Sequence, residues 1–256
     1  MSEEAAVLTE VRGRVLLITL NRPDQMNAVN TALAQGLVAA IKELDENPDL
    51  TAGVLTGAGR GFCAGMDLKA FLDGERVELE GRGLAGLTEA PPQKPLIAAV
   101  EGYALAGGFE IALACDLIVA SETARFGIPE VKRGLIAGSG GLIRLPERMP
   151  RQVALEFALT GRMMDADEAA HWGLVSRLTA PGDALDAARA LAQAIIANAP
   201  LAVAATKEIV NEAQNWPRSE LWTRQNAILE RIIASDDAEE GARAFAEKRA
   251  PEWRGT

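Results

Sequence analysis

The stretch GYALAGGFEIALACD, residues 102–116, decides the fold and raises a chemical question. Gly107 and Gly108 open a run of apolar residues that is typical of a buried helix. Glu110 lies in the first turn of that predicted helix, directly behind two residues suited to unusual backbone geometry. A carboxylate at this place in an apolar helix is therefore a candidate functional group.

The same plan of strand, glycine loop and helix occurs twice in the sequence. The first copy has a strand at 52–57, the loop GAGRGFCAG, and a helix in MDLKAFL. The second has a strand at 95–100, a loop at 101–108 and a helix at 109–115, followed by a strand at 116–121. Two copies suggest turns of one repeating α/β architecture.

The regions on either side of these copies have clear boundaries. We expect a hairpin with arms at 7–11 and 14–20, and an amphipathic helix over 31–46 with Asn30 as its N-cap. From about residue 150 the pattern becomes helix after helix, and Asp165 is predicted to cap one of these helices.

Residues 73–95 are rich in glycine and proline and show little periodicity. We therefore expect a surface segment or flap there.

Composition excludes several classes of function. The net charge is −10, which argues against a nucleic-acid binder. His171 is the only histidine and there are only two cysteines, so no multi-histidine or cysteine metal site is expected. No apolar run reaches the ~20 residues of a membrane span. The acidic start, MSEEAAVLTE, lacks the layout of a signal peptide, and we expect a cytoplasmic protein.

Two motifs resemble those of other classes of protein. GAGRG follows a strand, but its G-x-G-x-G spacing is not the dinucleotide-binding G-x-G-x-x-G. AGSGG, residues 137–141, resembles a nucleophile elbow, with Ser139 as nucleophile and His171 downstream as base. No clear strand precedes Ser139, so a serine hydrolase remains an alternative without its expected context.

Glu110 and Glu130 form a sharper pair of candidates. Pro129 restricts the backbone that presents Glu130. The turns FCAGMD and LAGGFE each end a strand and lead into a helix, so each can present an unpaired backbone N–H. Two such amides at one point would make an oxyanion hole. The alternative is that both glutamates are structural acids held in salt bridges.

Many segments together resemble the crotonase superfamily, the enoyl-CoA hydratase/isomerase group. The resembling stretches run in family order over nearly all of the chain: NRPDQMNAV, GAGRGFCAGMDLKAF, GYALAGGFEIALACDLIVA, FGIPEVKRG, GGLIRLP, ALTGRMMDADEAAHWGLVSRL, APLAVAATKEIV and AFAEKRAPEW. The resemblance implies an α/β crotonase-like ββα spiral at residues 1–195. It also implies a C-terminal helical trimerisation region at 196–256 and a homotrimer or hexamer.

The resemblance also assigns roles at the site. It places the oxyanion amides on Met66 and Gly107 and the two catalytic carboxylates on Glu110 and Glu130. It implies an acyl-CoA thioester substrate, with coenzyme A as part of the substrate and no separate cofactor. The residues that it implies for CoA binding are Gln25, Met26, Ala64, Gly65, Asp67, Leu68, Lys69 and Lys248, with Arg22 as a further candidate.

The positions where this sequence departs from or keeps the family's patterns reduce the number of expected activities. The position that carries a dehalogenase aspartate in another branch is Gly138 here, which disfavours dehalogenation. Keeping both glutamates favours an enoyl-CoA hydratase over a double-bond isomerase. GLAGLTE and EGARAFAEKRAPEWRG resemble the crotonobetainyl-CoA hydratase branch, although Gly138 departs from it. An isomerase, a hydrolase of branched hydroxyacyl-CoA and an acyl-CoA-binding protein without catalysis remain open.

Overall fold

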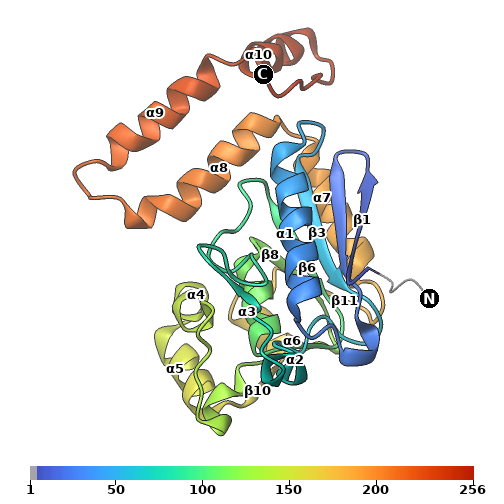
Figure 1. Ribbon diagram of the computed structural model, residues 1–256. Coiled ribbons are helices and arrows are strands. Elements are labelled where there is room, and N and C mark those ends of the chain that lie inside the picture. The colour runs from blue at the N-terminus through green and yellow to red at the C-terminus, as the bar shows by residue number, and fades with distance from the viewer. Residues whose placement is uncertain (1–4) are drawn as a thin grey trace.

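The computed structural model describes residues 5–256 and shows an α/β protein built on a central sheet (Figure 1). In spatial order the six strands of this sheet are β1 (Val7–Arg12), β2 (Val15–Leu20), β3 (Ala52–Gly57), β6 (Leu96–Val100), β8 (Leu117–Ser121) and β11 (Arg177–Thr179). β1 and β2 form the expected antiparallel hairpin, and the other neighbouring pairs are parallel. Because parallel pairs need crossover connections, helices separate these strands. The α/β class is confirmed.

Helices cover both faces of the sheet, which explains its nearly continuous apolar strands. α7 (Ala184–Ile196) packs on one face, while α1 (Thr31–Glu46) and α3 (Gly107–Ala114) belong to the cluster on the other. Because successive side chains alternate, Val54 joins the α7 cluster and Leu55 joins the larger one.

A second sheet has three strands, and one of them lies in the chain between β6 and α3. Its order is β10 (Met163–Asp165), β9 (Arg125–Gly127) and β7 (Tyr103–Leu105). The sequence assigned 101–108 to a loop, and β7 corrects this. A three-residue strand whose partners, β9 and Cys63, are distant in the sequence has no local periodicity to reveal it.

The predicted helix caps are confirmed. The Asn30 side chain accepts the N–H of Leu33, and α1 begins at the next residue after Asn30. The Asp165 side chain likewise accepts the N–H of Glu168 at the start of α6 (Ala166–His171). Each bond satisfies a donor that the first helical turn leaves free.

The helical part begins earlier than expected. α4 (Gly141–Arg148) comes before residue 150 and contains Pro146, a residue that usually interrupts a helix. The other helices are α2 (Leu68–Leu72), α5 (Arg151–Thr160), α8 (Pro200–Glu212), α9 (Leu221–Ile233) and α10 (Asp236–Glu247), with the 3-10 helices η1 (Pro23–Gln25), η2 (Pro129–Arg133) and η3 (Ala213–Asn215).

Residues 73–95 do not lie wholly on the surface, which corrects the expectation for this segment. A short hairpin of β4 (Glu78–Leu79) and β5 (Gly83–Leu84) forms there. Val77 and Leu84 are buried in the main core. These apolar residues are too widely spaced to give a periodic pattern, so the sequence alone did not predict an anchored segment.

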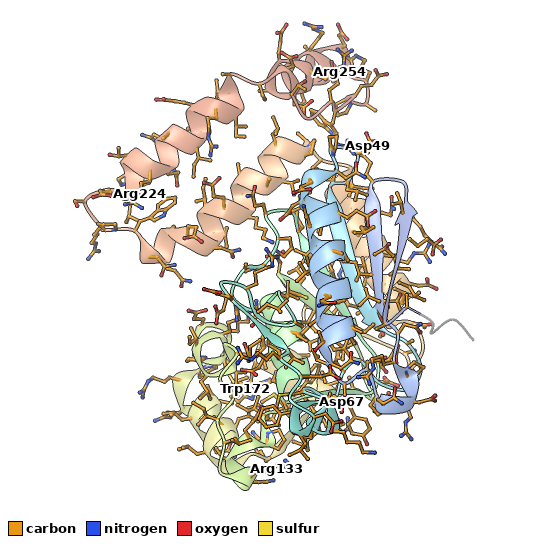
Figure 2. All side chains as sticks on the ribbon, in the orientation of Figure 1. Asp49, Asp67, Arg133, Trp172, Arg224 and Arg254 are labelled. Atoms are coloured by element: carbon orange, nitrogen blue, oxygen red, sulfur yellow. The ribbon has the colours of Figure 1, made fainter. Side chains whose placement is uncertain are left out.

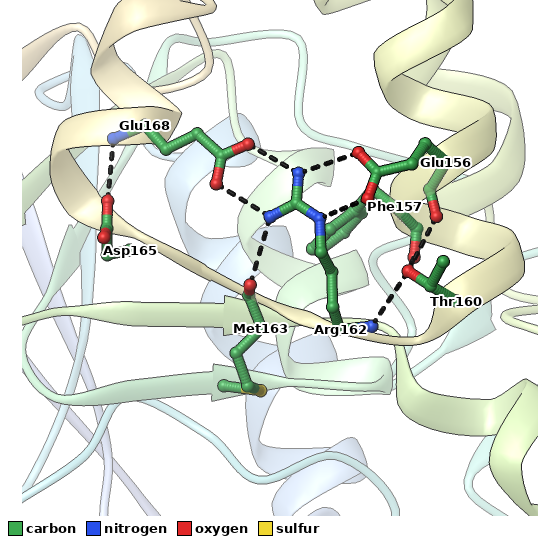
Figure 3. Close-up of polar contacts among 7 residues, drawn as sticks. All are labelled: Glu156, Phe157, Thr160, Arg162, Met163, Asp165 and Glu168. Carbon is green, nitrogen blue, oxygen red and sulfur yellow. Dashed lines mark hydrogen bonds and ion pairs between the residues drawn. The ribbon is translucent and has the colours of Figure 1, made fainter.

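One arginine ties the second sheet to two helices (Figure 3). Arg162 donates to both carboxylate oxygens of Glu156 on α5 and to both of Glu168 on α6. Its guanidinium lies 5.6 Å from the centre of the Phe157 ring. The planar guanidinium suits this bidentate arrangement. Arg162 immediately precedes β10, so it fixes the strand that pairs with β9.

α9 and α10 stand apart from the sheet (Figure 1), whereas Lys207 on α8 pairs with Asp116, directly before β8, at 2.7 Å. Among the described residues no single helix is both long and apolar enough to cross a membrane. One pair, Ala184–Ile196 with Pro200–Asn215, reaches the length and composition only when taken together, and it is bent by 107°.

Candidate active site

A cavity of about 400 Å³ opens beside the N-terminal end of α3. The two glycine turns, the β4–β5 segment, η2 and the loop before α4 all contribute to its wall. Its lining residues are Ala64, Met66, Leu68, Glu78, Leu84, Leu105, Ala106, Gly107, Glu110, Pro129, Glu130, Arg133, Leu135, Ile136, Gly138 and Ser139. The cavity thus brings together the predicted carboxylates and the predicted oxyanion residues.

Cys63 joins the first glycine turn to the second. Its N–H donates to the Tyr103 carbonyl at 3.1 Å, and its carbonyl accepts the Leu105 N–H at 2.9 Å. A Cβ at Gly108 would lie 2.6 Å from the carbonyl carbon of Cys63, so only glycine permits this approach. The Cys63 thiol is buried beneath the junction and donates to the Asn27 carbonyl at 3.1 Å.

The two turns lie directly against each other. Gly65 has a φ of 96°, and a Cβ there would lie 3.1 Å from the backbone nitrogen of Gly107. Ala106, next to Gly107, has φ 49° and ψ −130°, which is strained for a residue with a side chain. This backbone conformation sets the orientation of the peptide between Ala106 and Gly107. It therefore sets the direction of the Gly107 N–H.

The amides of Met66 and Gly107 are available for a ligand. Within residues 5–256 neither N–H has a hydrogen-bond acceptor, although the N–H groups of Asp67 and Ala106 beside them are bonded. Gly65 accepts the N–H of Val29 through its carbonyl, and Asp67 donates to the Val29 carbonyl. Unbonded amides beside one cavity are suited to stabilise negative charge on a ligand oxygen.

Glu110 is 2% exposed and held by two backbone amides. Its Oε1 accepts the N–H groups of Ser139 and Gly141, each at 2.8 Å. Burial raises the pKa of Glu110, and the nearby charges of Glu130 and Glu78 act in the same direction. The two amide bonds act against this shift because they favour the charged form.

The Glu130 carboxylate has fewer hydrogen-bond partners than the Glu110 carboxylate. It lies in the first turn of η2, next to Pro129, and its Oε2 is buried without a hydrogen-bond partner. Burial raises its pKa, and the charge of Arg133 opposes that effect. An unpartnered carboxylate oxygen in the cavity wall is available to bind a substrate hydroxyl or water. Neither Glu110 nor Glu130 forms a salt bridge in the described part of the chain. The alternative that both are structural acids held in salt bridges is therefore not supported.

The expected CoA-binding residues divide into two groups. Ala64 and Leu68 line the cavity. Asp67 instead caps α2 through the N–H groups of Lys69 and Ala70 and pairs with Arg22 at 2.9 Å. Burial opposes the Asp67 charge, but Arg22 and the amides outweigh it and lower the pKa. The side chains of Arg22 and Asp67 thus stabilise the fold at the start of α2.

The 25–26 region lies beside the cavity rather than in its wall. The Met26 carbonyl accepts the Ala64 N–H at 3.0 Å, which brings the two predicted stretches together. Gln25 and Lys69 are exposed nearby.

Lys248 does not reach this cavity within the same chain. It ends α10, at the opposite end of the molecule from α2 (Figure 1). Figure 2 shows the same separation, with Asp67 and Arg133 at one end and Arg254 at the other. The structure therefore does not bring Lys248 to the cavity of its own chain, and a contact with CoA across a subunit boundary stays a prediction.

The structure gives the serine-hydrolase alternative no support. The Ser139 hydroxyl donates to Glu78 at 2.8 Å. Over residues 5–256 no hydrogen bond joins Ser139 to His171, which instead packs edge-on against Trp172 with ring centres 4.6 Å apart. The sequence missed Glu78 because it lies in the aperiodic segment, where no motif marks it.

Known proteins resemble this chain over nearly its whole length. Residues 10–256 match the family described as enoyl-CoA hydratase/isomerase. A carnitinyl-CoA dehydratase of Proteus mirabilis is 43% identical over an alignment of 252 residues that covers 95% of this chain and 96% of that protein. A crystal structure of an enoyl-CoA hydratase from Mycobacterium tuberculosis is 58% identical, with a TM-score of 0.97, and covers 99% of this chain and 100% of that one.

A second solved structure agrees. An enoyl-CoA hydratase from Mycobacterium marinum is 59% identical, also with a TM-score of 0.97, and covers 99% of this chain and 100% of that one. The family match and these relatives extend through the spiral and the C-terminal helices. The chain therefore belongs to the enoyl-CoA hydratase/isomerase family and has the crotonase fold.

Proposed function

We propose that the protein is an enoyl-CoA hydratase that adds water syn across the C2–C3 double bond of a 2-enoyl-CoA. The reverse reaction dehydrates a 3-hydroxyacyl-CoA. The observation that carries this proposal is the opening of two unbonded amides and two carboxylates onto one cavity. Membership in the family supports an acyl-CoA substrate.

In this proposal the amides of Met66 and Gly107 bind the thioester oxygen. Charge accumulates on that oxygen as the enolate forms, so fixed donors stabilise the transition state more than the substrate. Each donor of this kind contributes about 10²–10³ in rate. Gly107 also begins α3, and the partial positive charge of the helix N-terminus favours the same anion.

The two glutamates divide the proton transfers. Ionised Glu110 takes a proton from the water whose oxygen bonds to C3, and the electron pair of the C2–C3 double bond moves into the enolate. Protonated Glu130 then delivers its proton to C2, so one water is added in total. Burial raises the pKa of both glutamates; two backbone amides oppose this shift at Glu110, whereas Oε2 of Glu130 has no hydrogen-bond partner, so we assign the ionised role to Glu110.

The substrate of the carnitinyl-CoA dehydratases supports a second candidate. Relatives with that name are 43% identical to this chain. The reaction is the same in kind, a reversible loss of water from a 3-hydroxyacyl-CoA, and only the acyl group differs. Gly138 stands where the crotonobetainyl-CoA branch is expected to carry an aspartate, so we place the ordinary hydratase first.

A direct assay tests both candidates. Loss of the conjugated enoyl absorbance is followed with crotonyl-CoA, longer 2-enoyl-CoAs and crotonobetainyl-CoA. We expect turnover of at least one of these without release of free thiol. Tight binding of every thioester without turnover would overturn the proposal and favour a binding protein, and release of CoA would favour a hydrolase.

We also propose that the protein assembles as a homotrimer or as a hexamer of two trimers. Large apolar side chains are exposed on the helices that stand apart from the sheet, including Trp222, Ile233 and Phe245. An isolated chain with such a surface is expected to associate. This arrangement would also allow Lys248 to approach the CoA of a neighbouring subunit.

A further inference from the structure

The β4–β5 segment forms part of the cavity wall and contacts the oxyanion turn. Glu78 and Leu84 both line the cavity. Leu84 lies so close to Gly107 that a Cβ on Gly107 would overlap its side chain. The segment that the sequence left without a role is therefore in contact with the candidate catalytic groups.

Two hydrogen bonds connect Glu78 to Glu110 through a single residue. The Ser139 hydroxyl donates to Glu78 Oε1 at 2.8 Å, and the Ser139 backbone N–H donates to Glu110 Oε1, also at 2.8 Å. The residue whose N–H donates to Glu110 is thus itself held by a side chain of the β4–β5 segment.

The loop that carries Ser139 has little stiffness of its own. Gly138 and Gly140 flank Ser139, and Gly140 has a φ of 101°. Leu135 and Ile136, just before them, are exposed. Because glycine restricts the backbone least, the position of the Ser139 amide depends on contacts from outside the loop.

We propose that Glu78 is a positioning residue for Glu110, acting through the hydroxyl and amide of Ser139. This inference rests on the proposed function, in which Glu110 must face the water that attacks C3. Glu78 does not touch the reacting atoms in this account. A misplacement of a catalytic group by about 1 Å can cost on the order of 100-fold in rate, so a lost tether is measurable.

Steady-state kinetics separate this role from a general structural one. We expect Glu78→Leu to lower kcat about 10-fold while KM changes less than about 2-fold, because the amides that bind the thioester are untouched. Glu78→Gln retains an oxygen that accepts the Ser139 hydroxyl, so it should restore kcat to within about 2-fold of wild type. Glu80→Gln, an exposed neighbour outside the cavity wall, is the matched control.

A double-mutant cycle tests the path through Ser139. Ser139→Ala removes the hydroxyl but keeps the backbone N–H, and it should lower kcat as much as Glu78→Leu does. The double variant should be no slower than either single variant, because both changes break one connection. Independent, multiplying effects would overturn the proposal, and so would an unchanged kcat in Glu78→Leu or a Glu78→Gln variant as slow as Glu78→Leu.

Amide hydrogen exchange provides a test that needs no turnover. In Glu78→Leu the peptide over 135–145 should exchange about 10-fold faster, while the α3 peptide stays protected. Glu78→Gln should exchange like wild type. Unchanged exchange in Glu78→Leu would overturn the positioning role even in an active enzyme. A wild type inactive on every enoyl-CoA would instead overturn the proposed function, and the exchange result would still decide the role of Glu78.

Discussion

Glu110 and Glu130 are similar acids in different surroundings. Two backbone amides hold one oxygen of Glu110, whereas Glu130 has a buried oxygen without any partner. In the proposed mechanism the first arrangement fixes the base in position, and the second leaves the acid free to bind what enters the cavity. Burial raises the pKa of both carboxyl groups, so the proposed difference in their protonation depends on the two amides at Glu110.

Replacing either glutamate tests their proposed roles. Glu110→Gln and Glu130→Gln should each lower kcat by about 10²–10⁴, because each removes one proton transfer from the transition state. The rate is measured on the best enoyl-CoA found in the substrate panel, with thermal melting to confirm folding. Glu122→Gln, an exposed glutamate away from the cavity, serves as control. Wild-type turnover in both site variants would contradict the mechanism.

The raised pKa of Glu110 makes a prediction about stability. The unfolded chain loses the proton near the usual value of 4.5, while the folded protein keeps it to a higher pH. Between these values the folded state binds more protons, so the free energy of unfolding falls as the pH rises through that window. Glu110→Gln should therefore melt at or above wild type near pH 7, with the difference shrinking at about pH 4. A variant that melts lower at neutral pH would show that the amides outweigh burial.

The contact between the two glycine turns predicts a strong effect at Gly108. Gly108→Ala places a Cβ 2.6 Å from the carbonyl carbon of Cys63, which is backbone and cannot rotate away. We expect a loss of about 2–3 kcal/mol, measured by denaturant unfolding. Gly138→Ala is the matched control, because its nearest neighbour would lie 4.0 Å from the new Cβ. Equal stability of the two variants would mean that the turns separate easily.

At the scale of elements, Arg162 joins α5, α6 and β10. Arg162→Met keeps much of the side-chain length but removes its bonds to Glu156 and Glu168. The expected loss is about 1–3 kcal/mol, since all these bonds are charge-assisted and those to Glu168 are partly buried. Arg189→Met, which breaks an exposed pair with Asp186, should cost less than about 1 kcal/mol. Thermal melts at two salt concentrations compare them.

The sequence predicted elements well where local patterns determine them. The strands and helices with clear apolar periods were found, as were the caps Asn30 and Asp165. β7 was missed because its partner is distant in the sequence, and α4 was missed because Pro146 hides its helical pattern. Tertiary pairing determines such elements, and local sequence carries little of that information.

The residues of the candidate site also differ in whether local sequence marks them or only the fold brings them together. Glu110 and Glu130 were identified because glycine and proline turns mark their neighbourhoods. Glu78 and the amides of Ser139 and Gly141 were not, since their importance depends on which segments meet in space. Lys248 was assigned to CoA by the family resemblance, and it lies at the end of α10, outside the wall of its own cavity.

For the whole molecule, the exposed apolar side chains of the C-terminal helices predict assembly. Light scattering after size-exclusion chromatography should give a mass of three or six chains at micromolar concentration. Trp222→Glu combined with Ile233→Glu places charges on this surface, where both side chains are largely exposed, and should shift the mass toward one chain. A wild-type monomer would contradict the proposed oligomer.

The buried thiol beneath the glycine turns has a practical use. Cys63 and Cys115 are the two cysteines of the chain, and burial raises the pKa of each to about 12. Neither offers a reactive thiolate to a colorimetric sulfhydryl reagent. Free coenzyme A released from a thioester would therefore be seen against almost no background from the protein, so hydrolysis and hydration can be told apart in one cuvette.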